Sequence, residues 1–322
     1  MIPTAHQHRS TQFILFVLSL FIVSHTLAAL PRPQTPAPVT PDSIPTLCSK
    51  AGSGDPSAIH QLHVYLLQQD RGAPGYDTAL NWLRVRAANG NPNSQFLLGY
   101  LFEHGHGAPR DLAQAANNYQ SAAAQGHSLA QNNLASLYQR GLGVPRDLQK
   151  ARDLYLSSAR QNNSAAQINL ASMYYLGDGV PRDFPEAARW FLAAANQGDP
   201  VAQHNLGVLY YRGEGVPLDF VAAAQWIGRA ATQNLPGAQT DLAFLYETGA
   251  GLSQDDFAAY VWYSRGLASG DSTGATRRHA IARRLSAKQR DEGQALAATR
   301  PSSPGDGIPW SSRNTFSVLP KH

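Results

Sequence analysis

Cysteine is almost absent from this 322-residue chain, which contains only Cys48. A single thiol cannot close an internal disulfide, although it could form a bridge between two chains. A scaffold stapled by internal disulfides is therefore excluded. We expect Cys48 to be a buried residue at the capped end of the fold.

The chain also lacks a complete set of residues for a metal site or a catalytic centre. His60 and His63 lie three residues apart, and His104 and His106 flank a glycine. No cysteine or acidic residue at a suitable spacing completes either pair. No lysine has a serine three residues before it, so the S-x-x-K motif is missing. We expect no catalytic residue, no metal and no cofactor.

Long hydrophobic runs are confined to the first thirty residues. Phe13 to Val23 is an apolar run of signal-peptide length, and residues 26–29 offer a small-residue cleavage site. We predict a signal peptide at residues 1–29, and hence an exported protein that is periplasmic or secreted. The alternative is an uncleaved membrane anchor. No cysteine follows the run directly, which argues against a bacterial lipoprotein.

Both flanks of the central region have the composition of connecting segments. Residues 30–50 are rich in proline and predict an extended linker. Residues 301–322 are rich in proline, serine and glycine and predict a disordered tail. One elongated domain at residues 51–270, followed by a helical segment at residues 271–300, remains between them.

Charge is unevenly distributed along the chain. The net charge of +4 divides into −3 over residues 51–270 and +5 over residues 271–322, with +2 before them. An acidic central region in an exported chain argues against nucleic acid as a partner. The basic segment could contact an acidic partner or lipid head groups, although we favour a solvated face. Its candidate contact residues are Arg277, Arg278, Arg283 and Arg284.

A Gly-x-Gly pair recurs five times at an interval of 36 residues. The pairs are Gly105/Gly107, Gly141/Gly143, Gly177/Gly179, Gly213/Gly215 and Gly249/Gly251. A period of this length is typical of stacked supersecondary units. The repetition decides the fold class and moves the functional question from catalysis toward binding.

Each interval encodes two helices. The first carries a glutamine, a leucine three residues later and an aromatic residue four residues after that, so all three share one helical face. Glycine ends this helix, and an aspartate opens the second one. We expect the glutamines to bond to the backbone of the neighbouring repeat, because buried amides must be satisfied. The glutamines are Gln95, Gln131, Gln167, Gln203 and Gln239, and the aspartates are Asp111, Asp147, Asp183, Asp219 and Asp255.

Units without the full signature flank the five repeats. A degenerate sixth repeat at about residues 54–90 predicts an N-terminal cap. At the other end, Ser286 and Gln289 form a predicted capping box that opens a last helix. Ile281 and Leu285 are expected to dock on the final repeat.

These residues closely resemble the Sel-one-like repeat family, a branch of the tetratricopeptide-type α/α solenoids. The family pattern A-x-x-x-L-(G/A)-x-x-Y-x-x-G-x-G-V-P-x-D is well matched in Ala130–Ala159 and Ala202–Ala231. The resemblance implies an all-α, right-handed superhelical solenoid of about six 36-residue helix-turn-helix repeats with a C-terminal capping helix. It also implies a concave face lined by the first helices, and protein or peptide partners, often in bacterial envelopes.

We therefore predict a non-enzymatic adaptor or regulator that binds a protein or peptide in its groove. Adjacent tyrosines and arginines on a concave surface are typical of binding hot spots, although ordinary surface variation explains them equally well. Two other classes stay open: a cell-wall or β-lactam hydrolase, and a scaffold for envelope polysaccharide or secretion machinery. Membrane contact is expected only through an uncleaved anchor or the basic terminal helix. The predicted groove residues are Arg140, Tyr175, His204, Tyr211 and Arg212.

Overall fold

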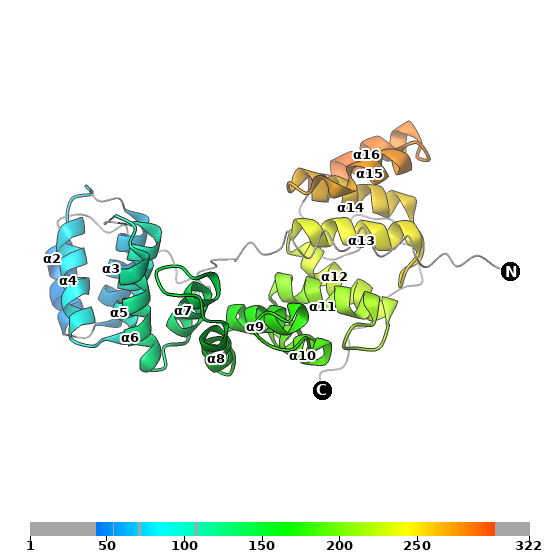
Figure 1. Cartoon of the computed structure of the whole chain (residues 1–322). Helices are drawn as coiled ribbons and strands as arrows, with labels where there is room; N and C mark the ends of the chain where they lie inside the picture. Colours follow the sequence, from blue (N-terminus) through cyan, green and yellow to red (C-terminus); the bar gives the residue numbers. More distant parts are fainter. Residues whose placement is uncertain (1–42, 54, 70–71, 107–108, 300–322) are drawn as a thin grey trace. The chain divides into compact units, whose positions relative to one another are not determined.

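The computed structural model describes residues 43–53, 55–69, 72–106 and 109–299 (Figure 1). Within these ranges the chain forms fifteen α-helices and no strand, which confirms the all-α solenoid prediction. The helices belong to two compact units, and their described parts are the N-terminal unit, residues 43–182, and the C-terminal unit, residues 183–299. The predicted signal peptide, the first part of the predicted linker and the predicted tail lie outside the described residues.

In both units, helices that follow one another in sequence pack together, except that α16 packs against α14. The N-terminal unit contains α2 (Ile44–Gly52), α3 (Pro56–Gln68), α4 (Tyr76–Ala88), α5 (Pro92–His104), α6 (Leu112–Ala124), α7 (Ser128–Arg140), α8 (Leu148–Ala159) and α9 (Ser164–Leu176). The C-terminal unit contains α10 (Phe184–Asn196), α11 (Pro200–Arg212), α12 (Phe220–Thr232), α13 (Pro236–Thr248), α14 (Asp256–Ala268), the short 3₁₀ helix η2 (Ser272–Gly274), α15 (Ala275–Ala282) and α16 (Ala287–Ala297).

Helix α2 begins inside the segment predicted as a linker. Pro45 stands in its first turn, where a missing backbone N–H leaves no helical hydrogen bond unmade. Ile44 and Ala51 are fully buried, and α2 packs against α3 and α4. Cys48 is partly buried against the same core. Pro45, the last proline of the predicted linker, therefore lies in the first turn of a helix, because apolar residues follow it at helical spacing.

The predicted helix ends are confirmed in all five repeats. The five aspartates are the N-cap residues of α6, α8, α10, α12 and α14, and each side chain accepts a hydrogen bond from a backbone N–H of the first turn. The first glycine of each pair ends the first helix in the left-handed conformation.

The second glycine of the pair ties a repeat to the one before it. Gly251 has φ +73°, and a Cβ atom there would collide with the backbone carbonyl of Phe220 at the start of α12. Gly143 has the same relation to Leu112 at the start of α6. The turn thus rests directly on the backbone of the preceding second helix, and only glycine allows both the conformation and the contact.

The buried glutamines form a second link between repeats. Each donates through Nε2 to an alanine carbonyl near the end of the preceding second helix, over 3.1–3.3 Å. In the second repeat, Gln131 also accepts a hydrogen bond from Gln161 at 2.8 Å. The expected bonds to neighbouring backbone are confirmed. Gln239 lacks the second bond, because Ser269 occupies the position where the earlier repeats have a glutamine.

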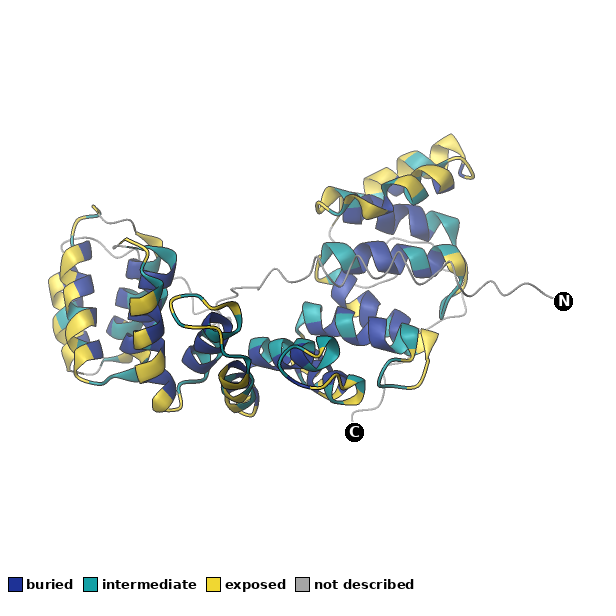
Figure 2. Cartoon of the chain, in the orientation of Figure 1, coloured by how far each residue is buried: buried dark blue, intermediate teal, exposed yellow. Residues whose placement is uncertain are grey.

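The C-terminal cap is a degenerate repeat that consists of two helices, whereas the sequence predicted a single capping helix. Gly274 and Ile281 stand 36 residues after Ala238 and Leu245, so α15 is a shortened first helix. The predicted capping box of α16 is confirmed. Ile281 and Leu285 are buried in the core of the C-terminal unit, as expected. Helix α14 is buried along most of its length, whereas α16 exposes much of its surface (Figure 2).

The Gly-Asp-Ser-Thr-Gly segment at residues 270–274 has the letters of a G-x-S-x-G nucleophile elbow. It forms the junction between α14 and α15, with a helix before it and a 3₁₀ turn within it. Its Asp271 side chain caps that turn by accepting a hydrogen bond from the backbone N–H of Thr273. A nucleophile elbow needs a strand before its serine, so this segment is a repeat junction.

Gly251→Ala should destabilise the C-terminal unit more than Gly270→Ala does. Both glycines have positive φ, +73° and +97°, and only Gly251 has backbone atoms where the new methyl group would lie. The left-handed conformation costs an alanine about 1–2 kcal/mol at either site. The collision at Gly251 should add about 1–3 kcal/mol. Urea denaturation measures both losses; equal losses would show that the second glycine makes no essential contact.

A partly buried histidine makes the stability of the N-terminal unit depend on pH. The His63 ring lies 6.1 Å from that of Trp82, and its Nε2 atom is shielded from solvent without a hydrogen-bond partner in the described part of the chain. Burial, with smaller contributions from nearby His60 and Arg86, lowers the pKa of His63 to about 4. The folded chain therefore disfavours the charged imidazole.

His63→Leu should flatten the dependence of stability on pH between 4 and 6.5. The unfolded chain binds the proton near the ordinary pKa of 6.5, so the stabilisation is complete above that pH and is lost as the pH falls through about 4. The loss over this window is about 3 kcal/mol. Urea denaturation at several pH values tests this, with the exposed His279→Leu as control. Parallel pH profiles for wild type and His63→Leu would contradict it.

Candidate functional site

The five predicted groove residues are divided between the two units. Arg140 is the exposed last residue of α7, and Tyr175 is a partly buried residue of α9. His204, Tyr211 and Arg212 all lie on α11 of the C-terminal unit.

His204 is a core residue. It is 1% exposed, and its Nε2 atom lies 2.7 Å from Oδ2 of Asp241, which is 4% exposed. The pair joins α11 to α13, the first helices of two successive repeats. The equivalent link in the N-terminal unit is a hydrogen bond from Asn169 to Asn132 over 3.1 Å. We use "column" for the set of residues that stand at the same position in successive repeats, 36 residues apart. The column of His204, which was predicted to face a partner, thus lies in the contact between adjacent first helices. His204 is therefore not available to a partner.

Tyr175 and Tyr211 occupy a position that other repeats use for an internal hydrogen bond. In those repeats a second-helix tyrosine donates to a side chain at this position: Tyr119 to Glu103, Tyr155 to Gln139 and Tyr263 to Glu247, over 2.7, 3.1 and 2.7 Å. Phe191 and Ile227 replace the second-helix tyrosine in the third and fourth repeats and carry no hydroxyl group. The pairing is absent there, and a tyrosine takes the first-helix position.

Tyr211 belongs to a series of ring contacts in the C-terminal unit. Its ring centroid lies 5.2 Å from that of Phe220, the first residue of α12, and 6.3 Å from that of Phe244 on α13. The guanidinium of Arg277 on α15 lies over the Phe244 ring, 4.8 Å from its centroid. These contacts thus form an unbroken series of aromatic and cationic groups that come from the first helices α11, α13 and α15 and the second helix α12.

An exposed apolar triplet adjoins these rings. Leu218, Phe220 and Val221 are 58%, 40% and 55% exposed. The other exposed large hydrophobic residues of the described ranges, Val85 and Leu192, are isolated in the sequence. Exposed apolar side chains that cluster in this way are typical of binding surfaces. We call the following set the apolar strip: Tyr211, Leu218, Phe220, Val221 and Phe244.

Leu218 departs from the repeat in a way that favours binding. Arg110 and Arg146 occupy the same column in the first two repeats, and each donates from Nε to a carbonyl near the end of its first helix, over 2.9 and 3.0 Å. Leucine cannot make this bond. An internal hydrogen bond has been exchanged for an exposed apolar side chain. Comparison of the repeats at this column could have revealed the site from the sequence.

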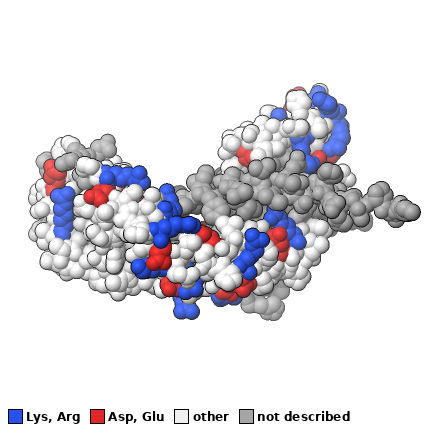
Figure 3. Space-filling model, in the orientation of Figure 1, with Lys and Arg blue, Asp and Glu red and all other residues white. Residues whose placement is uncertain are grey.

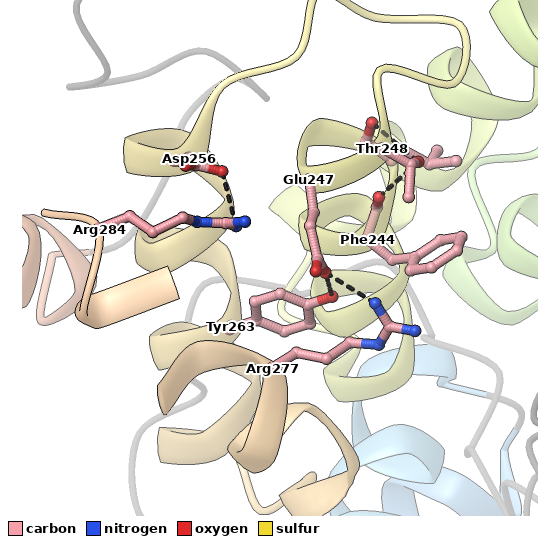
Figure 4. A network of polar contacts seen from close by, with 8 residues as sticks. Phe244, Glu247, Thr248, Asp256, Tyr263, Arg277 and Arg284 are labelled. Carbon is pink, nitrogen blue, oxygen red and sulfur yellow. Dashed lines mark hydrogen bonds and ion pairs between the residues drawn. The ribbon is translucent and has the colours of Figure 1, made fainter. Parts of the chain in front are cut away.

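The basic terminal segment contacts the last repeat through arginines whose side chains remain partly exposed, so its predicted solvated face stays a prediction. Arg277 forms an ion pair with Glu247 over 3.1 Å, and Glu247 also accepts a hydrogen bond from Tyr263 (Figure 4). Arg284 pairs with Asp256 over 2.9 Å in the same view. These contacts attach α15 and its following turn to α13 and α14.

Arg278 makes the most extensive of these contacts. Its guanidinium donates to Ser264 over 2.7 Å, to Tyr260 over 3.2 Å and to Gln294 over 2.9 Å. Arg283 is exposed. In the space-filling view, lysine and arginine side chains gather over the end of the unit that α15 and α16 form (Figure 3). Arg277, Arg278 and Arg284 therefore attach the cap to the last repeat, while Arg283 and Arg284 remain exposed.

Two further features are not found within the described ranges, a metal site and a membrane-spanning helix. No group of three or more histidine, cysteine, aspartate or glutamate side chains there is placed to hold a metal ion. His104 contacts Tyr100 instead, through a hydrogen bond of 3.0 Å between its Nδ1 atom and the carbonyl and through ring stacking. None of the described helices has the length and apolar character needed to cross a membrane.

Comparison with known proteins identifies the repeat. The model of the Sel1 repeat matches five consecutive segments: residues 92–127, 128–163, 164–199, 200–235 and 236–271. A Sel1 repeat protein from Oxalobacter formigenes is 30% identical, with a TM-score of 0.61 over 69% of this chain and 91% of that one. A sel1 repeat protein from Klebsiella pneumoniae is 22% identical, with a TM-score of 0.42 over 63% of this chain and 99% of that one. No curated protein matches the chain.

Arg278→Ala should loosen the terminal cap, whereas Arg283→Ala should not. Removing Arg278 leaves the partly shielded Ser264 and Tyr260 groups without a donor, which costs about 1–3 kcal/mol. An exposed arginine contributes less than about 0.5 kcal/mol. Urea denaturation, with hydrogen exchange of α15 and α16, measures the difference. Equal stability of the two variants would contradict the structural role of Arg278.

Proposed function

We propose that this chain, which belongs to the Sel1 repeat family, is a non-enzymatic adaptor or regulator that binds a protein or peptide through its apolar strip. Proteins with Sel1 repeats generally mediate protein–protein interactions. The observation that carries the proposal is the exposed triplet Leu218, Phe220 and Val221 beside the Tyr211 ring. The strip lies within one unit, so the proposal needs no particular arrangement of the two units.

The chemistry of the strip suits an apolar anchor on the partner. Covering an exposed leucine, valine or phenylalanine side chain contributes up to about 1.5–3 kcal/mol. Charged residues are neighbours of the apolar side chains in the sequence, and polar groups are typical of the rim of an interface. Arg212 on α11 lies 3.8 Å from Glu214, and its side chain is 17% exposed. The predicted groove residues Tyr211 and Arg212 therefore remain part of the proposed surface, whereas His204 does not.

The proposed setting is the bacterial envelope, in the periplasm or outside the cell. Its support is the apolar run from Phe13 to Val23 and the small residues that follow it. In the proposed arrangement the repeats are exported and meet their partner there. Arg140 and Tyr175 of the N-terminal unit stay a separate candidate surface within that unit.

Capture of a specific partner should depend on the strip. In crosslinking pull-downs from the native envelope, Tyr211→Ala combined with Leu218→Arg should reduce capture of a protein that wild type binds by about tenfold or more, equivalent to about 1.4 kcal/mol. Arginine is the residue of the first two repeats at this column, so the fold should accept it. Val85→Arg, at an exposed apolar residue of the N-terminal unit, is the matched control.

Two results would contradict the proposal. Equal capture by wild type, the strip variant and the variant that combines Arg140→Ala with Tyr175→Ala would remove both surfaces as partner sites. Turnover of a cell-wall fragment or a β-lactam by the purified protein would contradict the non-enzymatic assignment and favour the hydrolase alternative.

A further inference from the structure

The apolar strip has a candidate occupant within the same chain. We propose that the strip binds residues 308–319 and that a partner has to displace this segment. This inference rests on the binding role proposed for the strip. The segment lies outside the described residues, and its sequence supplies five apolar side chains within twelve positions. They are Ile308, Trp310, Phe316, Val318 and Leu319.

The charges of the segment and the strip are complementary. Residues 307–321 contain Arg313 and Lys321 and no acidic residue. The exposed carboxylate of Asp219 lies between Leu218 and Phe220 in the sequence. Glu214, in the turn before them, has a side chain that is 30% exposed. Opposite charges beside an apolar contact favour one partner over others and fix its position.

The length of the connection is sufficient. The described chain ends at Thr299, just after α16, in the same unit as the strip. Helix α16 packs on α14, and α13 contacts both α14 and α12. Three interhelical distances of 8–10 Å amount to about 30 Å. Eleven extended residues, from Thr299 to Trp310, can span about 36 Å.

The expected strength of the contact suits a displaceable segment. A surface of three exposed side chains gives a free peptide an affinity only in about the millimolar range. A short tether supplies an effective concentration of about the same size, so the segment would occupy the strip much of the time. A partner with a larger complementary surface then displaces it without needing an unusually high affinity.

Limited digestion of the full chain with trypsin tests the inference, because Arg313 lies within the proposed segment. A bound segment is cleaved only after it detaches, so weaker binding raises the rate of cleavage. Leu218→Arg should accelerate cleavage after Arg313 by about fivefold or more, as followed by mass spectrometry. Val85→Arg should leave the rate unchanged, since it alters an exposed apolar residue of the other unit.

A second variant examines the other side of the contact. Trp310→Ser combined with Phe316→Ser should accelerate cleavage to a similar extent, without any change to the strip. Adding Leu218→Arg to that variant should give little further acceleration, because two changes to one contact are not additive. This variant also tests the inference if Leu218→Arg fails to fold.

Two results would overturn the inference. Unchanged cleavage after Leu218→Arg and after the tail substitutions would show that residues 308–319 do not bind the strip. Partner capture then separates the two proposals. If Leu218→Arg abolished capture although cleavage was unchanged, the proposed function would stand and only the binding of residues 308–319 would be rejected. If capture was unchanged as well, both the proposed function and this inference would be rejected. Protection that weakens as the protein is diluted would identify the occupant as a segment of a second copy of the chain.

Discussion

The contact between the Gly-x-Gly turn and the preceding second helix, which the backbone makes at Gly143, Gly215 and Gly251, is the constraint on which the repeats depend. A side chain at Gly143 or Gly251 would occupy the space of backbone atoms, so successive repeats approach as closely as their main chains allow. The buried glutamines satisfy helix-end carbonyls across the same contact. Because turn and backbone fix this register within each unit, the residue at a given column has the same surroundings from repeat to repeat.

This regularity makes the departures informative. Arg110 and Arg146 complete the end of a first helix, whereas Leu218 in the same column exposes an apolar side chain. Tyr211 stands where Glu103 accepts a hydrogen bond from a second-helix tyrosine. Both departures fall in the fourth repeat, and the Tyr211 ring contacts that of Phe220, two residues after Leu218. The strip is thus a local surface built from positions that elsewhere serve the fold.

The sequence predicted the repeats, their helix ends and the capping box of α16, because these depend on local backbone conformation and on a period that five copies repeat. It missed the burial of His204, because a column that varies between repeats can face either a partner or the adjacent first helix. It also missed Leu218, because the predicted groove residues all lie on first helices and Leu218 lies in the turn that follows one. The start of α2 was hidden because Pro45 suits both a linker and a first helical turn.

The central claim is that a partner binds the C-terminal unit at the apolar strip. Amide hydrogen exchange of the full chain, alone and with the protein that it captures from the native envelope, tests this most directly. The account predicts slower exchange of the segment from Tyr211 to Val221 and of the end of α13 around Phe244 in the complex. Slower exchange confined to the N-terminal unit, with these segments unchanged, would contradict it.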